Sequence, residues 1–215
     1  MDQLPQIPVK SYAELRQEIR SGDILLCSGT SIFSNLIQQA TQSVWSHVAF
    51  ILRLDVIDRI MILESVESIG VRAVTLSSYV QDYDGTGKAY PGHLMIARHK
   101  HFNQDHISNL SKYAVDLLGH PYNKQEILRI AARISMNNTN VSPQLDTLKQ
   151  PEFICSEYAY TCFQSVGIHI NYDPKGFIAP ADFARCPEVK PLAFIENSFV
   201  TQAHSNKTQI DAISA

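Results

Sequence analysis

The chain has 215 residues, of which 45% are hydrophobic and 18% are charged. This length and composition suit one globular domain that buries a sizeable core without disulfides or structural metals. The formal net charge is −3, the isoelectric point lies near 6.2 and no run of basic residues occurs. The sequence therefore argues against binding to nucleic acid or to an anionic membrane surface.

Cysteine usage and the chain start indicate a reducing compartment. The four cysteines form no CxxC pair, so neither a zinc knuckle nor a thioredoxin-type site is expected. Cys155 and Cys162 lie seven residues apart on one expected helix, too far along its axis for a disulfide. The N-terminal residues lack the basic start and apolar core of a signal peptide, and no apolar run approaches membrane-spanning length. We therefore expect a cytoplasmic protein without an integral membrane segment.

Helical periodicity and helix end signals recur along the chain. They predict helices at residues 11–20, which begin with a capping box of Ser11 and Glu14, and at 31–40, 104–118, 125–136, 155–166 and 179–183. The second helix is expected to bury Ile32, Phe33, Leu36, Ile37 and Ala40, and the third Ile107, Leu110, Ala114, Val115 and Leu118. Residues 137–150 are polar and asparagine-rich, which predicts an exposed loop able to act as a flap.

Apolar runs of strand length alternate with these helices. They occur at residues 24–27, 45–52, 59–65, 69–76, 93–98 and 189–195. A short polar connection joins the second and third runs, which predicts an antiparallel hairpin, and the following runs are expected to continue it as a meander. The prediction is an α+β fold with a β-meander packed against helices, in a single domain of residues 1–200, with a polar, disordered tail at 201–215.

Cys155 lies where an extended segment turns into a helix. A cysteine there points its sulfur at unpaired backbone N–H groups and at the positive end of the helix dipole, which favours the thiolate over the thiol. Cys155 is therefore a candidate nucleophile. The alternative is a small buried hydrophobe without a chemical role, which is the commoner fate of a lone cysteine in an apolar run.

Two further residues supply the other groups that a cysteine hydrolase needs. His47 is the ionisable residue inside the strand at 45–52, and Glu64 ends the strand paired with it. An imidazole can hold the thiol proton and return it to the leaving group, while a carboxylate orients the imidazole. On one face of a hairpin the two side chains would be near neighbours. The alternatives are a core histidine and a solvated strand-end carboxylate, and Glu67 competes with Glu64 because the register is not fixed by the sequence.

An ordered set of short motifs resembles the circularly permuted papain-like hydrolases of the YaeF/YiiX type, relatives of the NlpC-type peptidases and of lecithin:retinol acyltransferase. The motifs are Gly22-Asp23-Ile24-Leu25-Leu26, Trp45-Ser46-His47-Val48-Ala49, Glu64, Gly119-His120-Pro121-Tyr122-Asn123, Phe153-Ile154-Cys155-Ser156-Glu157 and Ala179-Pro180-Ala181-Asp182. They span about residues 21–182, and the histidine precedes the cysteine as the permuted group requires. The resemblance implies a permuted papain-like (NlpC-type) fold with the nucleophile at a helix N-terminus.

Carried over residue by residue, the resemblance implies Cys155 as nucleophile, His47 as general base and then acid, and Glu64 as the residue that orients the imidazole. The backbone N–H of Cys155 would contribute to an oxyanion hole, because a helix N-terminus presents donors where negative charge develops. Tyr122 would line the cleft. The alternative is that Tyr122 is an aromatic residue packed in the core. Trp45 would shield the ion pair or floor the substrate groove, with core packing as an equal alternative.

The function implied by the resemblance is a cysteine amidase or peptidase that cleaves a peptide-like or lipid-amide bond through an acyl-enzyme. An acyltransferase, or a thioesterase or lipid esterase, would use the same Cys-His pair, and a binding domain would retain the fold without catalysis. No cofactor and no metal are expected. The His-x-His pair His99 and His101, with His106 nearby, lacks a companion carboxylate or cysteine cluster, so we expect a solvated loop there. The oligomeric state cannot be predicted from the sequence.

Overall fold

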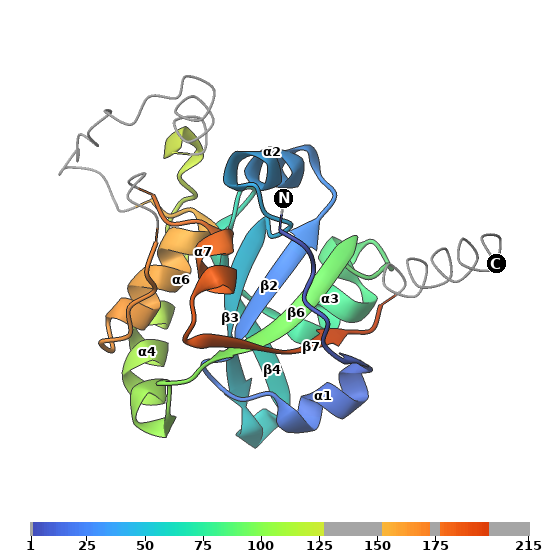
Figure 1. The fold of residues 1–215 in the computed structure, drawn as a ribbon. Coiled ribbons are helices and arrows are strands. Elements are labelled where there is room, and N and C mark those ends of the chain that lie inside the picture. The colour runs from blue at the N-terminus through green and yellow to red at the C-terminus, as the bar shows by residue number, and fades with distance from the viewer. Residues whose placement is uncertain (1, 127–151, 173–176, 198–215) are drawn as a thin grey trace.

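The computed structural model describes residues 2–126, 152–172 and 177–197 (Figure 1). Three sequence predictions fall outside these ranges: most of the helix expected at 125–136, the loop at 137–150 and the tail at 201–215. Among the described residues, no helix is long and apolar enough to cross a membrane.

A seven-stranded sheet forms the centre of the molecule, in the order β1-β7-β6-β2-β3-β4-β5. Its strands are β1 Val9–Lys10, β2 Ile24–Gly29, β3 His47–Leu54, β4 Arg59–Val66, β5 Gly70–Thr75, β6 Gly92–His99 and β7 Val189–Ile195. All neighbours are antiparallel except β1 and β7, which run parallel. The predicted strands and the β3–β4 hairpin are confirmed, and the fold is α+β as expected.

The predicted meander is correct only for β2 to β5, each of which pairs with the next along the chain. Strand β6 does not continue it but returns to the far side of β2. The reason lies in helix α3, Leu76–Gln81, and the 3-10 turn η2, Tyr83–Gly85, which the sequence analysis did not resolve from a loop. Leu76 and Tyr79 are buried against one face of the sheet, so this segment carries the chain across that face from one edge toward the other.

Helices cover both faces of the sheet. Helices α4 (Gln104–Asp116), α6 (Cys155–Gln164) and α7 (Pro180–Arg185) lie on one side, and α1 (Tyr12–Glu18) and α3 on the other (Figure 1). Successive strand residues divide between the two cores, as alternation requires: Phe50 and Leu63 pack under α6, whereas Ile51 and Ile62 pack with α1 and α3. Both faces are therefore closed by apolar contacts.

Two expected buried helix faces are only partly buried. The capping box of Ser11 and Glu14 begins α1 as predicted. Helix α2, Ile32–Thr41, also begins after Ser31, but none of its residues is fully buried and Ile32 is 88% exposed. Its apolar face borders a pocket instead of the core. In α4 the prediction is likewise wrong for two of five residues, because Val115 and Leu118 lie on the solvent side while Leu110 and Ala114 reach the core.

Candidate active site

Cys155 is the first residue of α6, and its backbone surroundings fix it at the end of the sheet. Ile154 is the extended N-cap, and its N–H donates to Glu157 Oε2 at 3.0 Å, so a glutamate of the first turn closes the helix start. The hydroxyl of Ser65, on β4, donates to the carbonyl of Phe153 at 2.7 Å. This buried bond ties the segment before α6 to the strand that also carries Glu64. The sequence prediction of a cysteine at a helix N-terminus is confirmed.

His47 and Glu64 form the hydrogen-bonded pair that the hairpin suggested. His47 begins β3, and its Nε2 lies 2.6 Å from Oε2 of Glu64. The Glu64 side chain has no solvent exposure, and that of His47 is 15% exposed. The two alternatives of a lone core histidine and a solvated carboxylate are therefore not observed. Glu67, the competitor, lies near the surface and pairs with Lys124 at 3.6 Å.

Two residues that sequence reasoning missed hold the carboxylate of Glu64. Arg72 Nε donates to Oε1 at 2.8 Å, and the Tyr79 hydroxyl donates to Oε2 at 2.6 Å. Burial alone would raise the pKa of Glu64, but the hydrogen bonds and charges of His47, Arg72 and Tyr79 lower it below its usual range. The group is therefore an anion in the core, compensated by three donors.

His47 also interacts with Cys155. Nε2 of the imidazole faces the Glu64 carboxylate, and Cys155 lines the same groove as His47. Burial alone would lower the pKa of His47, but the charges and hydrogen bonds of Cys155 and Glu64 raise it to about 10. The site therefore favours an imidazolium between the buried Glu64 anion and the Cys155 side chain, which is the arrangement that a cysteine hydrolase needs.

The other three cysteines lack such a partner set. All four are free, and Cys27, Cys162 and Cys186 are buried. Burial raises the pKa of each of these three thiols above its usual value. Their environments are those of inert core cysteines.

A polar groove leads to the cysteine from the side of the histidine. His47, Ser46, Glu67 and Tyr122 line it together with Cys155, and two further tyrosines, Tyr83 and Tyr90, form part of its wall. Tyr122 also packs against Ile154, and burial raises the pKa of its phenol above the usual range. The sequence prediction that Tyr122 lines the cleft agrees with this position.

Trp45 does not line this groove. The side chain is 3% exposed and stacks on Phe194 of β7, with ring centroids 6.4 Å apart. It borders a separate hollow beneath the N-terminal segment, near Pro5. Alternation along β3 puts His47 on the face of Ala49, but Trp45 precedes the strand and does not follow this alternation, and it packs into the core on the α6 side with Val48 and Phe50. We therefore assign Trp45 to core packing and remove it from the substrate-binding residues.

The histidines near the start of α4 are not a solvated loop as a group. His99 ends β6 and is 3% exposed, and burial lowers its pKa. His106 accepts from the backbone N–H of Asn103 at 3.1 Å and so caps α4, while His101 is exposed. Within the described ranges, no group of three or more histidine, cysteine, aspartate or glutamate side chains is placed to hold a metal ion.

The fold and the site together define a class of protein. A cysteine at a helix N-terminus, in one groove with a histidine that a buried carboxylate holds by a hydrogen bond, is the arrangement of a cysteine hydrolase with papain-like chemistry. The histidine precedes the cysteine in the chain, which is the permuted order.

Comparison with known proteins identifies the family. A family model described as permuted papain-like amidase enzyme, YaeF/YiiX, C92 family, matches residues 18–128, and the chain belongs to this family. It is therefore a cysteine-type enzyme of the amidase or peptidase kind. The matched segment includes His47 and Glu64 and ends before Cys155. The choice of Cys155 as candidate nucleophile therefore rests on its place at the start of α6 and in the groove with His47.

A solved structure shows the same fold. The crystal structure of metalloprotein yiiX from Escherichia coli O157:H7 superposes with a TM-score of 0.58 at 17% sequence identity, covering 83% of this chain and 98% of that one. A comparison with curated proteins finds no match.

Proposed function

We propose that the protein hydrolyses an amide bond with Cys155 as nucleophile, His47 as general base and acid, and Glu64 as the residue that positions the imidazole. One observation carries the proposal: the His47 ring is hydrogen-bonded to the buried Glu64 carboxylate and lines one groove with Cys155, whose interaction with the ring helps to raise the pKa of His47. A purely structural histidine does not need a compensated buried anion and a cysteine at a helix N-terminus in the same groove.

The chemistry follows from these positions. The Cys155 sulfur attacks the carbonyl carbon, and the carbonyl π electrons move to oxygen to give a tetrahedral anion. The anion collapses, the C–N bond breaks, and the His47 imidazolium donates its proton to the departing nitrogen. A water molecule, deprotonated by the now neutral His47, then attacks the thioester and releases the acid and the thiolate. The network around Glu64 holds the imidazole in place through both steps.

The backbone of α6 supplies electrostatic assistance to the first step. N–H groups of a first helical turn have no intrahelical partner and point toward the developing charge. Cys155 is itself the first residue of that turn, so its own N–H lies beside the carbonyl that its sulfur attacks. We therefore assign the Cys155 N–H to the oxyanion hole.

The acyltransferase and esterase alternatives share the first step and differ in the group that resolves or receives the acyl unit. The groove beside His47 is lined by hydroxyl groups and admits water, which favours hydrolysis. We also propose a reducing, cytoplasmic location, since four unpaired cysteines suit such a compartment.

The test uses a panel of N-acyl amides, peptides and acyl esters with product analysis by mass spectrometry. We expect turnover and a covalent acyl adduct on Cys155 in the wild type, and neither in Cys155→Ala or His47→Ala. Cys162→Ala is the matched control, because it removes another buried cysteine of the same helix that does not contact the imidazole. Adding an amine or alcohol acceptor distinguishes transfer from hydrolysis. Turnover that survives Cys155→Ala would refute the proposal.

A further inference from the structure

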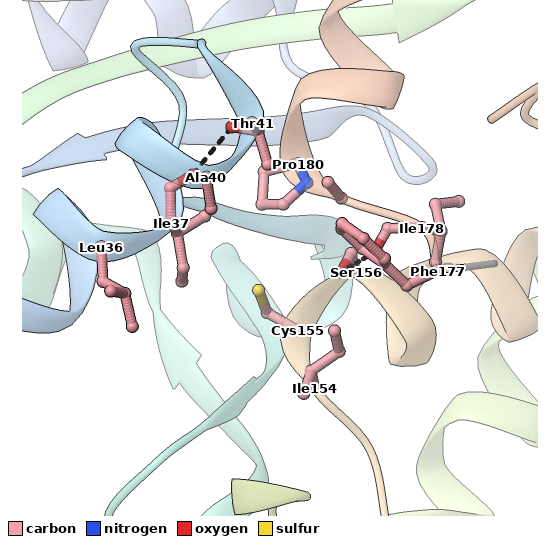
Figure 2. A pocket seen from close by; sticks show the side chains of 11 residues that line it. Leu36, Ile37, Ala40, Thr41, Ile154, Cys155, Ser156, Phe177, Ile178 and Pro180 are labelled. Atoms are coloured by element: carbon pink, nitrogen blue, oxygen red, sulfur yellow. Dashed lines mark hydrogen bonds between the residues drawn. The ribbon is translucent and has the colours of Figure 1, made fainter. Parts of the chain in front are cut away.

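A second, apolar pocket opens on the other side of the nucleophile. It lies between α2, the start of α6 and the segment before α7, and it is open to solvent on one side. Leu36, Ile37 and Ala40 of α2 form one wall, and Ile154, Phe177 and Ile178 face them. Figure 2 shows the sulfur of Cys155 pointing toward the space between these walls.

The polar atoms in this lining are turned away from the space. The Thr41 hydroxyl donates to the carbonyl of Ile37 at 2.9 Å, and the Ser156 hydroxyl donates to the carbonyl of Ile178 at 2.7 Å (Figure 2). Apart from Cys155, the nucleophile, none of the described lining residues has an ionisable side chain. The pocket therefore offers dispersion contacts and no hydrogen-bond partner of its own, which suits a hydrocarbon group and disfavours a peptide backbone.

The groove has the opposite character. The described residues along it include several hydroxyl groups and the carboxylate of Glu67, and neither lysine nor arginine is among them. The groove and the apolar pocket share two lining residues, Ile37 and Cys155. Cys155 thus lies at the junction of a dry compartment and a polar one.

The histidine decides which half of a substrate occupies which compartment. His47 lines the groove and not the apolar pocket. The departing nitrogen receives its proton from His47, so the amine half must lie on the groove side. The acyl half, on the other side of the attacked carbonyl, then extends into the apolar pocket.

We propose that the substrate is an N-acyl amine whose aliphatic acyl chain occupies the apolar pocket and whose polar, uncharged or cationic amine occupies the groove. This inference rests on the proposed function of Cys155 and His47. The acyl chain is transferred to the sulfur as the C–N bond breaks, the amine leaves along the groove with the proton of His47, and water then releases the fatty acid.

The experiment measures acylation of Cys155 by a series of p-nitrophenyl esters from acetyl to decanoyl, with the adduct located by peptide mass spectrometry. We expect the second-order rate to rise about fourfold for each methylene that fits, equivalent to ~0.8 kcal/mol per buried CH2. Ala40→Phe fills the pocket and should remove this rise with chain length. Gln39→Phe places the same side chain on the exposed face of α2 and is the control. A rate independent of chain length in the wild type would overturn the inference.

Two further measurements keep the outcome decisive. Leu36→Ser puts a hydroxyl in the pocket wall at a residue that is 38% exposed, so folding tolerates it, and it should weaken long-chain acylation as Ala40→Phe does. Decanoate binding to Cys155→Ala, followed by calorimetry, tests the pocket without chemistry. Absent acylation at every length with decanoate bound would refute the proposed function and retain the pocket, whereas acylation without decanoate binding or chain-length dependence would refute the pocket alone.

Discussion

The network around Glu64 makes a sharp prediction for Glu64→Gln. This change keeps the shape of the side chain and removes its charge. In the wild type, one carboxylate accepts from His47 and Tyr79 at one oxygen and from Arg72 at the other. An amide has a single acceptor oxygen, so when that oxygen faces His47 and Tyr79 its NH2 group points at the Arg72 donor, and the reverse orientation exposes His47 to a donor instead.

The magnitude follows from the hydrogen bonds that remain. A bond to a charged group contributes about 1.5–3 kcal/mol and a neutral one about 0.5–1.5 kcal/mol, so the imidazolium of His47 loses roughly 1–2 kcal/mol of stabilisation. That loss corresponds to a roughly 5- to 30-fold lower rate of any reaction that depends on the ion pair. Unfolding should also become easier by about 3 kcal/mol, the low end for a broken buried pair, because Arg72 keeps Asp84 as a partner.

The assay is the alkylation rate of Cys155 by iodoacetamide at near-neutral pH, followed by peptide mass spectrometry, with stability measured by urea unfolding. Glu18→Gln is the matched control, since Glu18, on α1, pairs with Lys10 and does not line the groove. We expect the control to leave the alkylation rate unchanged. An equal fall in both variants, or an unchanged rate in Glu64→Gln, would refute the assignment of Glu64 as the positioning residue.

Three further predictions concern other parts of the fold. Burial raises the pKa of Glu157 to about 7, so the folded chain binds a proton that the unfolded chain releases. The free energy of unfolding should therefore decrease as pH rises from about 4.5 to about 7, by roughly 3 kcal/mol, and Glu157→Gln should flatten this slope in urea titrations. Gly70→Ala should lower the melting temperature, because Gly70 has φ +91° and an added Cβ would meet a backbone carbonyl oxygen at 2.2 Å; Gly85→Ala, with φ +72° and open space, should cost less. Tyr79→Phe should reduce stability by about 1–2 kcal/mol and slow alkylation less than Glu64→Gln, because Glu64 keeps two donors, and an equal or larger slowing would contradict this ranking.

The sequence indicated that His47 and Glu64 could be neighbours because both lie on one expected hairpin. A short polar connection between two apolar runs leaves an antiparallel pair as the natural arrangement, and alternation then puts the two side chains on one face. What could not be predicted was the register, and with it the choice between Glu64 and Glu67. Register is set by packing on both faces of the sheet, which no local pattern encodes.

Arg72 was missed although the signal for it was present. The tight corner at Gly70 pairs β4 with β5 so that Glu64 lies directly opposite Arg72. Opposite charges at facing positions of an expected hairpin indicate an ion pair. Tyr79 gave no such signal, because it comes from α3, and that helix was not distinguished from a loop.

The first family motif, at Gly22 and Asp23, has a structural role and not a catalytic one. Gly22 has φ +85° and leaves room for the ring of Phe102, and Asp23 is buried and paired with Arg98 at 2.6 Å. They fix the turn into β2, at the end of that strand far from Cys27, whose neighbour across the ladder is His47.

Trp45, beside His47 in the chain, likewise supports the core and not the chemistry. The ordered motifs therefore indicate the fold of the sheet, and this fold brings His47, Glu64 and Cys155 close together. Their proximity depends on a hydrogen bond that none of the motifs predicts. The Ser65 hydroxyl, on β4, donates to the carbonyl of Phe153 and thereby holds the start of α6 near His47. Substitution of Ser65 by alanine should accordingly weaken Cys155 alkylation without touching any of the three residues, whereas an unchanged rate would mean that packing of α6 alone sets its position.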